Sequence, residues 1–295
     1  MEIGFCGTGR MGAAMVQRLL DQGHRLTVWN RSADKLKPLV ERGARAAKAP
    51  ADTVAASEII VTMLTDARAV DAVYDGPHGL LSGAVRGKLF IDMSTVTPAT
   101  TVALAERVRG KGAALVECPV GGTIGPARDG KLLGLAGGEP ADFARAKPIL
   151  DQLCRRVDHL GRNGAGSAMK LAINLPLIVY WEALGEALSL VRDLGVAPAK
   201  LLEIMSESSG GTNALKNRAP KLVTALQGGA PDVGFDIDGM RKDLRTMAEA
   251  AGALGVELPA AATALASYDA AAKDGWGNRD GSSLTAWRAQ QAKKR

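Results

Sequence analysis

The chain has 295 residues, of which 46% are hydrophobic and 23% are charged, a composition typical of a globular protein with room for two domains. The formal net charge of +6 suits anionic ligands, but no run of five basic residues occurs and aromatic residues are only 4%, which argues against a nucleic-acid partner. Three widely spaced cysteines and three histidines, none in a ligand-like pair, argue against a disulfide framework and predict no metal site.

The N-terminus reads as an apolar strand, residues 2–6, that runs into the pattern G-x-G-x-x-G. The pattern is formed by Gly7, Thr8, Gly9, Arg10, Met11 and Gly12. In a dinucleotide-binding βαβ unit, the first glycine makes a tight turn, the second lets a pyrophosphate approach the backbone, and the third lets the helix pack on its strand. An amphipathic segment and a second apolar run at 25–29 complete such a unit. The sequence therefore predicts that residues 7–12 bind a dinucleotide, with an ordinary packing turn as the alternative.

The end of the second apolar run bears on which dinucleotide is bound. An NAD site usually has a carboxylate there for the ribose hydroxyls, whereas this chain has Asn30, Arg31 and Ser32. Arginine and serine can bind a 2′-phosphate that a carboxylate would repel. We therefore predict NADP as the cofactor, with NAD as the alternative, in which case Arg31 is a solvated surface cation.

Short apolar runs alternate with helical segments up to residue 160. Strands are predicted at 2–6, 25–29, 58–64, 88–92, 113–118, 132–136 and 156–160, with helical segments such as 66–74, 98–110 and 141–153 between them. This alternation is typical of a Rossmann-type α/β domain with a mainly parallel sheet covered by helices. In such sheets ligands bind outside the carboxyl ends of the strands.

The second part of the chain lacks strand patterns. Helices are predicted at 167–194, 198–206, 213–227, 236–254 and 258–274. We therefore expect a dinucleotide-binding domain at 1–163 and an all-helical domain for substrate binding and dimerisation at 164–295. The segment 171–191 is apolar enough to resemble a membrane span, but Glu182, Glu186 and Pro176 interrupt it, which favours a buried helix. With a core strand at the N-terminus and no signal peptide expected, we predict a cytoplasmic protein without a membrane partner.

The strongest candidate for chemistry is Lys170, near the start of the first helix of the second domain. A lysine that loses solvent and meets positive neighbours is favoured in its neutral form, which makes it a usable general base or acid. Asn174 lies four residues on and therefore shares a helical face with Lys170. The alternative is an exposed lysine followed by a capping asparagine.

Three further segments carry groups that could bind a substrate or cofactor. Ser94 and Thr95 follow a predicted strand, and their hydroxyls could bind a carboxylate or merely cap the next helix. Gly121, Gly122 and Thr123 offer consecutive backbone donors, an anion-binding nest, or else form a flexible loop. The pair Lys242-Asp243 on a late helix could be a plain surface ion pair.

Taken together, these motifs make the chain similar to the β-hydroxyacid dehydrogenase family, which includes 3-hydroxyisobutyrate dehydrogenases and tartronate semialdehyde reductases, and more distantly to 6-phosphogluconate dehydrogenase. The resemblance covers nearly the whole chain and rests on residues 7–12, 92–98, 119–122, 164–170 with Asn174, and Phe235 with 242–244.

The resemblance implies roles for particular residues. It implies Lys170 as the catalytic acid/base and Asn174 as its substrate-orienting partner. It places Ser94, Gly121 and Gly122 near a substrate carboxylate. It places a last group near the cofactor, namely Met63, Leu64, Thr95 and Lys242.

Two departures from the family pattern concern the substrate. The family's substrate loop commonly reads P-V-S-G-G, but this chain has Gly121 in place of the serine and Thr123 in place of the second glycine. The family's helix usually reads K-x-x-N-N, and here Asn174 is flanked by Ile173 and Leu175. The missing serine hydroxyl puts the usual small branched substrate in doubt.

The leading hypothesis is an NADP-dependent oxidoreductase that acts on a small β-hydroxy acid or its semialdehyde, assembled as a homodimer or homotetramer. One alternative is an imine reductase, although such enzymes generally lack this lysine. The other is a non-catalytic dinucleotide-binding interaction module, which the retention of Lys170 with Asn174 disfavours.

Overall fold

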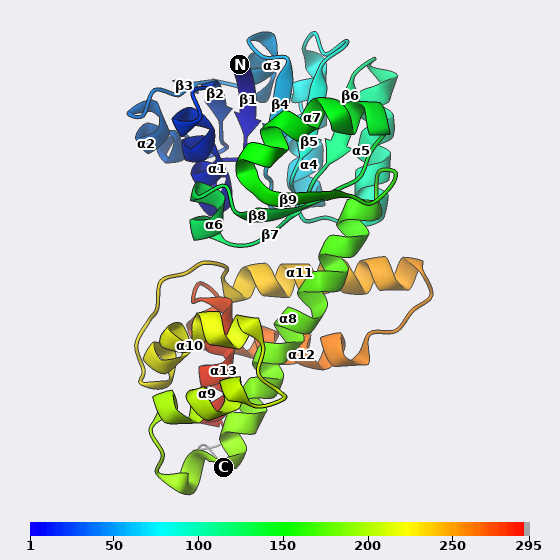
Figure 1. The fold of residues 1–295 in the computed structure, drawn as a ribbon. Coiled ribbons are helices and arrows are strands. Elements are labelled where there is room, and N and C mark those ends of the chain that lie inside the picture. The colour runs from blue at the N-terminus through cyan, green and yellow to red at the C-terminus, as the bar shows by residue number, and fades with distance from the viewer. Residues whose placement is uncertain (292–295) are drawn as a thin grey trace. The chain divides into compact units, whose positions relative to one another are not determined.

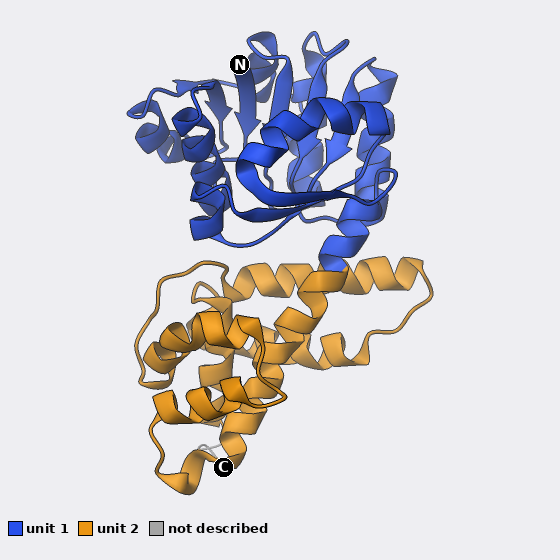
Figure 2. Ribbon diagram, in the orientation of Figure 1, with its two compact units in different colours: residues 1–171 blue, residues 172–295 orange. Residues whose placement is uncertain are grey.

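The structure is a computed structural model that describes residues 1–291 (Figure 1). The chain divides into two compact units, Met1–Leu171 and Ala172–Arg295 (Figure 2). The sequence-based division after residue 163 falls just before helix α8 (Ala165–Leu190), whose first two turns belong to the first unit.

The first unit is built on a six-stranded sheet in which all strands are parallel. Its strand order is β3-β2-β1-β4-β5-β6. The strands are β1 (Glu2–Cys6), β2 (Arg25–Trp29), β3 (Arg45–Ala46), β4 (Ile59–Thr62), β5 (Leu89–Asp92) and β6 (Ala114–Glu117). All were predicted within two residues at either end except β3, whose two exposed residues carry no strand pattern.

The carboxyl ends of five strands meet in one row across the sheet. Trp29 is opposite Cys6, Cys6 opposite Thr62, Thr62 opposite Asp92, and Asp92 opposite Glu117. The segments that follow these strands therefore begin at the same edge of the sheet, where ligands bind in such folds.

A second, three-stranded sheet follows and differs from the expected continuation of the parallel sheet. It consists of β7 (Val120–Gly121), β8 (Leu132–Ala136) and β9 (Cys154–His159), with β7 antiparallel and β9 parallel to β8. The connection from β7 to β8 holds only the short helix α6 (Ile124–Arg128), and it is too short for the crossover that a parallel pair needs. The antiparallel pairing of β7 follows from this length.

Helices cover both faces of the six-stranded sheet. Their bounds in the first unit are α1 (Arg10–Asp21), α2 (Lys37–Val40), α3 (Pro50–Ala55), α4 (Ala67–Asp75), α5 (Pro98–Gly110) and α7 (Pro140–Leu153). Side chains that alternate along the strands feed two cores. Phe5 joins the core under α1 and α7, whereas Cys6 joins the core under α4 and α5.

The second unit is helical, as expected. After α8 come α9 (Pro198–Glu207), α10 (Asn213–Leu226), α11 (Ile237–Ala253), α12 (Pro259–Ala271) and α13 (Leu284–Gln291), of which only α13 was not predicted. Helix α8 continues through Pro176, and an 18-residue window of it has a mean hydropathy of 1.3, so by length and composition it could cross a membrane. Its carbonyls at Ile178 and Trp181 accept hydrogen bonds from Tyr268 of α12 and Thr285 of α13, so α8 is bonded to two later helices of this unit.

The three cysteines are buried and free. Burial raises the pKa of Cys6 and of Cys154 to about 12, and it raises the pKa of Cys118 as well. Because the thiolate is the reactive form, these side chains behave as small apolar groups of the core.

Candidate functional site

The glycine loop between β1 and α1 has the geometry that its sequence predicts. Gly7 has φ +99°, and a Cβ there would lie 2.3 Å from the carbonyl oxygen of Met63. A Cβ on Gly12 would lie 1.9 Å from the carbonyl oxygen of Gly7. Both positions therefore need glycine for the loop to close on its neighbours.

Gly9 is different, because a Cβ there would meet nothing within 4 Å. Gly9 is also the N-cap of α1 and provides no side-chain cap. The hydroxyl oxygen of Thr8, beside it, is buried and has no hydrogen-bond partner within residues 1–291. An open space, an uncapped helix start and an unpaired hydroxyl together fit the pyrophosphate of a dinucleotide.

The loop after β2 is tied to the glycine loop by Asn30. The backbone N–H of Thr8 donates to Oδ1 of Asn30 over 3.1 Å, and Nδ2 of Asn30 donates to the carbonyl of Ser32 over 3.0 Å. Asn30 thus orders this edge with both ends of its amide. Arg31 and Ser32 are both exposed.

Ser94 joins the ends of β4 and β5. Its Oγ donates to Oδ1 of Asp92 over 2.7 Å and accepts from the backbone N–H of Leu64 over 2.9 Å, while its own backbone N–H also reaches the Asp92 carboxylate. Thr62 donates to the same Oδ1 over 2.6 Å. Burial raises the pKa of Asp92, and the bonds from Thr62 and Ser94 oppose that rise. To bind a substrate carboxylate as expected, Ser94 would have to give up one of these bonds.

Neither Ser94 nor Thr95 caps the next helix. That role belongs to Thr97, whose Oγ1 accepts from the backbone N–H of Thr100 at the start of α5. Met63, whose N–H donates to the carbonyl of Cys6 over 3.0 Å, is half-buried, as is Thr95. Met63 and Thr95 thus lie just past the carboxyl ends of β4 and β5, at the edge where the glycine loop begins.

The segment 121–123 is ordered by its neighbours rather than being a flexible loop. Gly121 pairs with Leu133 in the second sheet. Gly122 has φ +128°, and a Cβ there would lie 2.7 Å from a methyl carbon of Leu132. Thr123 precedes α6 as its N-cap but makes no side-chain cap bond.

Glu117, at the end of β6, is a buried carboxylate that the sequence analysis did not single out. It is 1% exposed, and its carboxylate accepts from the backbone N–H groups of Gly164, Gly166 and Ser167 and from Oγ of Ser167. Burial raises the pKa of Glu117, and these bonds oppose the rise. The signal in the sequence was a lone carboxylate inside an otherwise apolar strand.

Helix α8 carries the two residues expected to do chemistry. Lys170 is 8% exposed and Asn174 is 6% exposed. The structure therefore does not show the exposed lysine that the sequence left open as the alternative. Their spacing of four residues places them on one face of the continuous helix.

In the second unit, Asn174 is held by a residue of α11. Its Nδ2 donates to Oδ2 of Asp243 over 2.8 Å, and Nζ of Lys242 lies 2.5 Å from Oδ1 of the same carboxylate. Asp243 is buried, so Lys242-Asp243 is not the plain surface ion pair considered from the sequence. Asp243 shares the buried face of α11 with Met240, Leu244 and Met247. This helical spacing from apolar residues is the sequence feature that could have indicated its burial.

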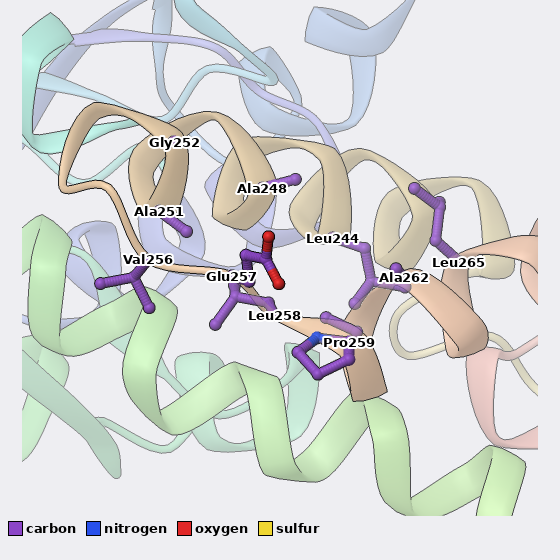
Figure 3. Close-up of a pocket in the computed structure, with 11 residues that line it drawn as sticks. Leu244, Ala248, Ala251, Gly252, Val256, Glu257, Leu258, Pro259, Ala262 and Leu265 are labelled. Carbon is purple, nitrogen blue, oxygen red and sulfur yellow. The ribbon is translucent and has the colours of Figure 1, made fainter.

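A cavity of about 370 Å³ lies in the second unit between α11 and α12 (Figure 3). Its walls are mostly alanine, leucine and valine side chains, with the carboxylate of Glu257 among them. None of the site residues predicted from the sequence lines it. This cavity is therefore separate from the chemistry described above.

Comparisons with known proteins agree with this geometry. The model of the NAD binding domain of 6-phosphogluconate dehydrogenase matches residues 2–161, and a model described as NAD-binding of NADP-dependent 3-hydroxyisobutyrate dehydrogenase matches residues 164–287. Glyoxylate/succinic semialdehyde reductase 1 of Arabidopsis thaliana is 34% identical over 96% of this chain and 97% of its own length.

Two solved structures show how closely the fold is shared. The 3-hydroxyisobutyrate dehydrogenase of Mycobacterium tuberculosis, solved with L-serine, superposes with a TM-score of 0.85 at 27% identity, over 96% of this chain and 97% of that one. A reductive aminase from Aspergillus terreus, solved with NADPH and ethyl levulinate, is more distant, with a TM-score of 0.64 at 26% identity over 97% and 98% of the two chains. The chain belongs to the β-hydroxyacid dehydrogenase family and is an NAD(P)-dependent oxidoreductase.

Proposed function

We propose that the protein transfers a hydride between NADP(H) and a small β-hydroxy acid or its semialdehyde, with Lys170 as the general acid/base. The observation that carries the proposal is the buried position of Lys170 on a helix whose start is bound to the end of β6. β6 ends in the same row as β1, which precedes the glycine loop. Two of the relatives named above, the glyoxylate/succinic semialdehyde reductase and the 3-hydroxyisobutyrate dehydrogenase, are named for small hydroxy acids or aldehyde acids, which supports this substrate class.

The residues that would hold the dinucleotide belong to the first unit. The backbone at Gly9 and the hydroxyl of Thr8 suit the pyrophosphate. Exposed Arg31 and Ser32 suit a 2′-phosphate through charge-assisted hydrogen bonds, which supports NADP over NAD. When bound, the nicotinamide supplies or takes up the hydride.

Lys170 moves the proton that accompanies the hydride. In reduction, its ammonium donates a proton from Nζ to the substrate carbonyl oxygen, which becomes a hydroxyl. In oxidation, the neutral amine accepts that proton from the hydroxyl. Asn174, on the same face of α8, orients the substrate oxygen toward Nζ, and its own amide is fixed by Asp243.

The substrate's acid group would be bound by the segment 121–123. Its backbone N–H groups and the hydroxyl of Thr123 are donors suited to an anion. Gly121 leaves room where relatives carry a serine side chain. This combination favours a three- to five-carbon acid that is bulkier or more polar than hydroxyisobutyrate.

A turnover screen tests the proposal. Glyoxylate, succinic semialdehyde, 3-hydroxyisobutyrate and L-serine would be assayed with NADP(H) and NAD(H), next to a cyclic ketone with an amine as the substrate pair of a reductive aminase. We expect turnover of one or more of the three- and four-carbon acids, with NADP(H) preferred and glyoxylate the poorest of the acids. Turnover of the ketone–amine pair alone would identify an imine reductase, and cofactor binding without any turnover would identify a non-catalytic module.

The acid-binding role of residues 121–123 has its own comparison. The best semialdehyde acid would be assayed beside its uncharged methyl ester, and we expect kcat/KM to fall at least tenfold for the ester. Equal values for the two compounds would remove the anion site from the proposal.

A further inference from the structure

Glu117 links the strand that leads into segment 121–123 to the helix that carries Lys170. Oε1 accepts from the N–H of Gly164 and, over 3.0 Å, from the N–H of Gly166. Oε2 accepts from Oγ of Ser167 and, over 3.2 Å, from its N–H. The carboxylate thus takes up three of the N–H groups at the start of α8 that have no partner within the helix.

The contact is reinforced from a second helix. Oγ of Ser167 lies 2.9 Å from Oγ1 of Thr101, which is buried in α5. Ser167 therefore has one partner in the sheet edge and one in α5. A helix start bound on two sides cannot rotate or slide without breaking charge-assisted bonds, which are stronger than neutral ones.

The strand end that carries Glu117 is itself held on both sides. Its backbone N–H and carbonyl exchange hydrogen bonds of 2.9 and 3.0 Å with Gly137, and Asp92 is its neighbour across the sheet. A Cβ on Gly137 would come within 2.3 Å of Oε1 of Glu117. The absence of a side chain at residue 137 leaves the space that the carboxylate occupies.

Lys170 lies one helical turn beyond Ser167. Three residues advance an α-helix by about 4.5 Å, so a shift at Ser167 is transmitted to Lys170 almost unchanged. On the other side, only Cys118, Pro119 and Val120 separate Glu117 from Gly121. The carboxylate thus bonds the end of β6, four residues before the segment proposed to bind the acid group, to the start of the helix that carries Lys170.

We propose that Glu117 is a positioning residue that sets Lys170 relative to the substrate segment 121–123. The proposal rests on the function proposed above for Lys170. Burying a carboxylate costs free energy unless the carboxylate is fully hydrogen-bonded. The hydrogen bonds that offset this cost for Glu117 are the same ones that fix the start of α8.

The test compares Glu117→Ala and Glu117→Gln with the unaltered enzyme. Glu117→Ala removes every bond to α8, and we expect kcat to fall about 10- to 100-fold, since a displacement of about 1 Å can cost two orders of magnitude. The affinity for NADPH should stay within twofold, because the glycine loop is not touched. Glu117→Gln keeps one acceptor oxygen but presents an NH2 group to Ser167. Its kcat should therefore lie between that of Glu117→Ala and that of the unaltered enzyme.

Asp52→Asn is the matched control. Asp52 caps a different helix of the same unit, α3, by accepting from the N–H groups of Lys48 and Ala49, and it has no bond to α8. This variant should lower the thermal midpoint without changing kcat. A kcat of Glu117→Ala equal to that of the unaltered enzyme would overturn the proposal. It would also be overturned if Glu117→Ala and Asp52→Asn each lost kcat in proportion to the fall in thermal midpoint.

Two readouts separate this proposal from the proposed function. The pH profile of kcat should shift its midpoint in Glu117→Gln and stay in place in Asp52→Asn, because only the former alters the surroundings of Lys170. If the unaltered protein turns over no substrate, the proposed function fails. Hydrogen exchange of residues 164–171 and the acylation rate of Lys170 then test Glu117 alone. Both should rise in the Glu117 variants, and unchanged values would overturn the positioning role.

Discussion

The amide of Asn174 donates through Nδ2 to Oδ2 of Asp243 over 2.8 Å, and both side chains are buried, at 6% and 2% exposure. The other carboxylate oxygen of Asp243 is paired with Lys242. One carboxylate of α11 therefore fixes which end of the Asn174 amide faces α11. The orientation of a residue proposed to hold the substrate oxygen thus depends on a residue outside the dinucleotide motifs.

Replacing Asp243 should cost both stability and rate. Asp243→Ala removes the hydrogen bond that the buried Asn174 amide donates to Asp243, so we expect a loss of about 1–3 kcal/mol in the free energy of unfolding, measured with urea. Asp243→Asn keeps an acceptor oxygen and should lose less, and kcat should follow the same order. The control is Asp238→Asn on the same helix, whose side chain is 57% exposed and pairs with Arg241. Equal unfolding curves for Asp243→Ala and Asp238→Asn would contradict the prediction.

The elements that the sequence predicted well are those whose pattern is local. Strands β1 and β2 match their expected bounds at both ends, because each is an apolar run that stops at glycine or a polar turn. Pro98–Gly110 was likewise expected as a helix and begins with proline at its first position.

The features that could not be predicted depend on partners far along the chain. β7 has two residues and exists only through its pairing with β8. Ser94 hydrogen-bonds to a partner two residues back and to another thirty residues away, which its local sequence does not indicate, and its place near a substrate carboxylate stays a prediction. Glu117 caps a helix that begins nearly fifty residues later, a relationship with no local signature.

The glycine loop allows a paired prediction that separates ligand binding from folding. Gly9→Ala places a methyl group in open space at an allowed backbone conformation, so the unfolding midpoint should barely change. The same methyl group occupies the place proposed for the pyrophosphate, and the affinity for NADPH should fall at least tenfold in a fluorescence titration. Gly12→Ala should instead lower the unfolding midpoint clearly, because its Cβ would overlap the Gly7 carbonyl. Unimpaired NADPH binding by Gly9→Ala would place the pyrophosphate elsewhere.

Arg31 is expected to select the cofactor. A hydrogen bond to a charged group contributes about 1.5–3 kcal/mol, so Arg31→Ala should weaken NADPH binding by roughly ten- to a hundredfold and leave NADH binding unchanged. Both cofactors would be titrated against each variant. Arg42→Ala is a suitable control, since Arg42 is an exposed arginine already paired with Asp21. Parallel losses for both cofactors would indicate a role unrelated to the 2′-phosphate.

Asp280 should make stability depend on pH. Its buried carboxylate lies 2.6 Å from Arg218 and accepts from Gly234 and Ser282. Burial alone would raise the pKa of Asp280, but Arg218 and these bonds bring it below the usual 3.8. A depressed pKa contributes stability that is complete above the unfolded value and is lost as pH falls through the folded one.

Asp280→Asn should therefore unfold more easily at pH 7, by about 3–5 kcal/mol for a broken buried pair. The difference from the unaltered protein should begin to shrink as the pH falls below about 4, where the carboxylate of the unfolded chain becomes protonated, and it should be lost once the pH falls through the lower pKa of the folded carboxylate. Urea titrations at several pH values measure this. Asp193→Asn, which removes an 87% exposed partner of Arg192, should show almost no difference at any pH. A gap that is constant down to pH 3 would rule out the carboxylate as its source.

Lys170 carries the most direct prediction about chemistry. If its amine moves the substrate proton, Lys170→Ala should lower kcat by about 10²–10⁴-fold, the usual contribution of a general acid or base. Lys170→Arg keeps the positive charge but cannot release a proton near neutral pH, so it should be nearly as slow as Lys170→Ala. NADPH affinity should persist in both variants, because the dinucleotide is expected at residues 7–12 and 30–32, and titration of NADPH fluorescence checks this. The exposed lysine variant Lys131→Ala serves as the control and should keep full activity. Turnover by Lys170→Arg close to that of the unaltered enzyme would show that the lysine supplies charge and no proton transfer.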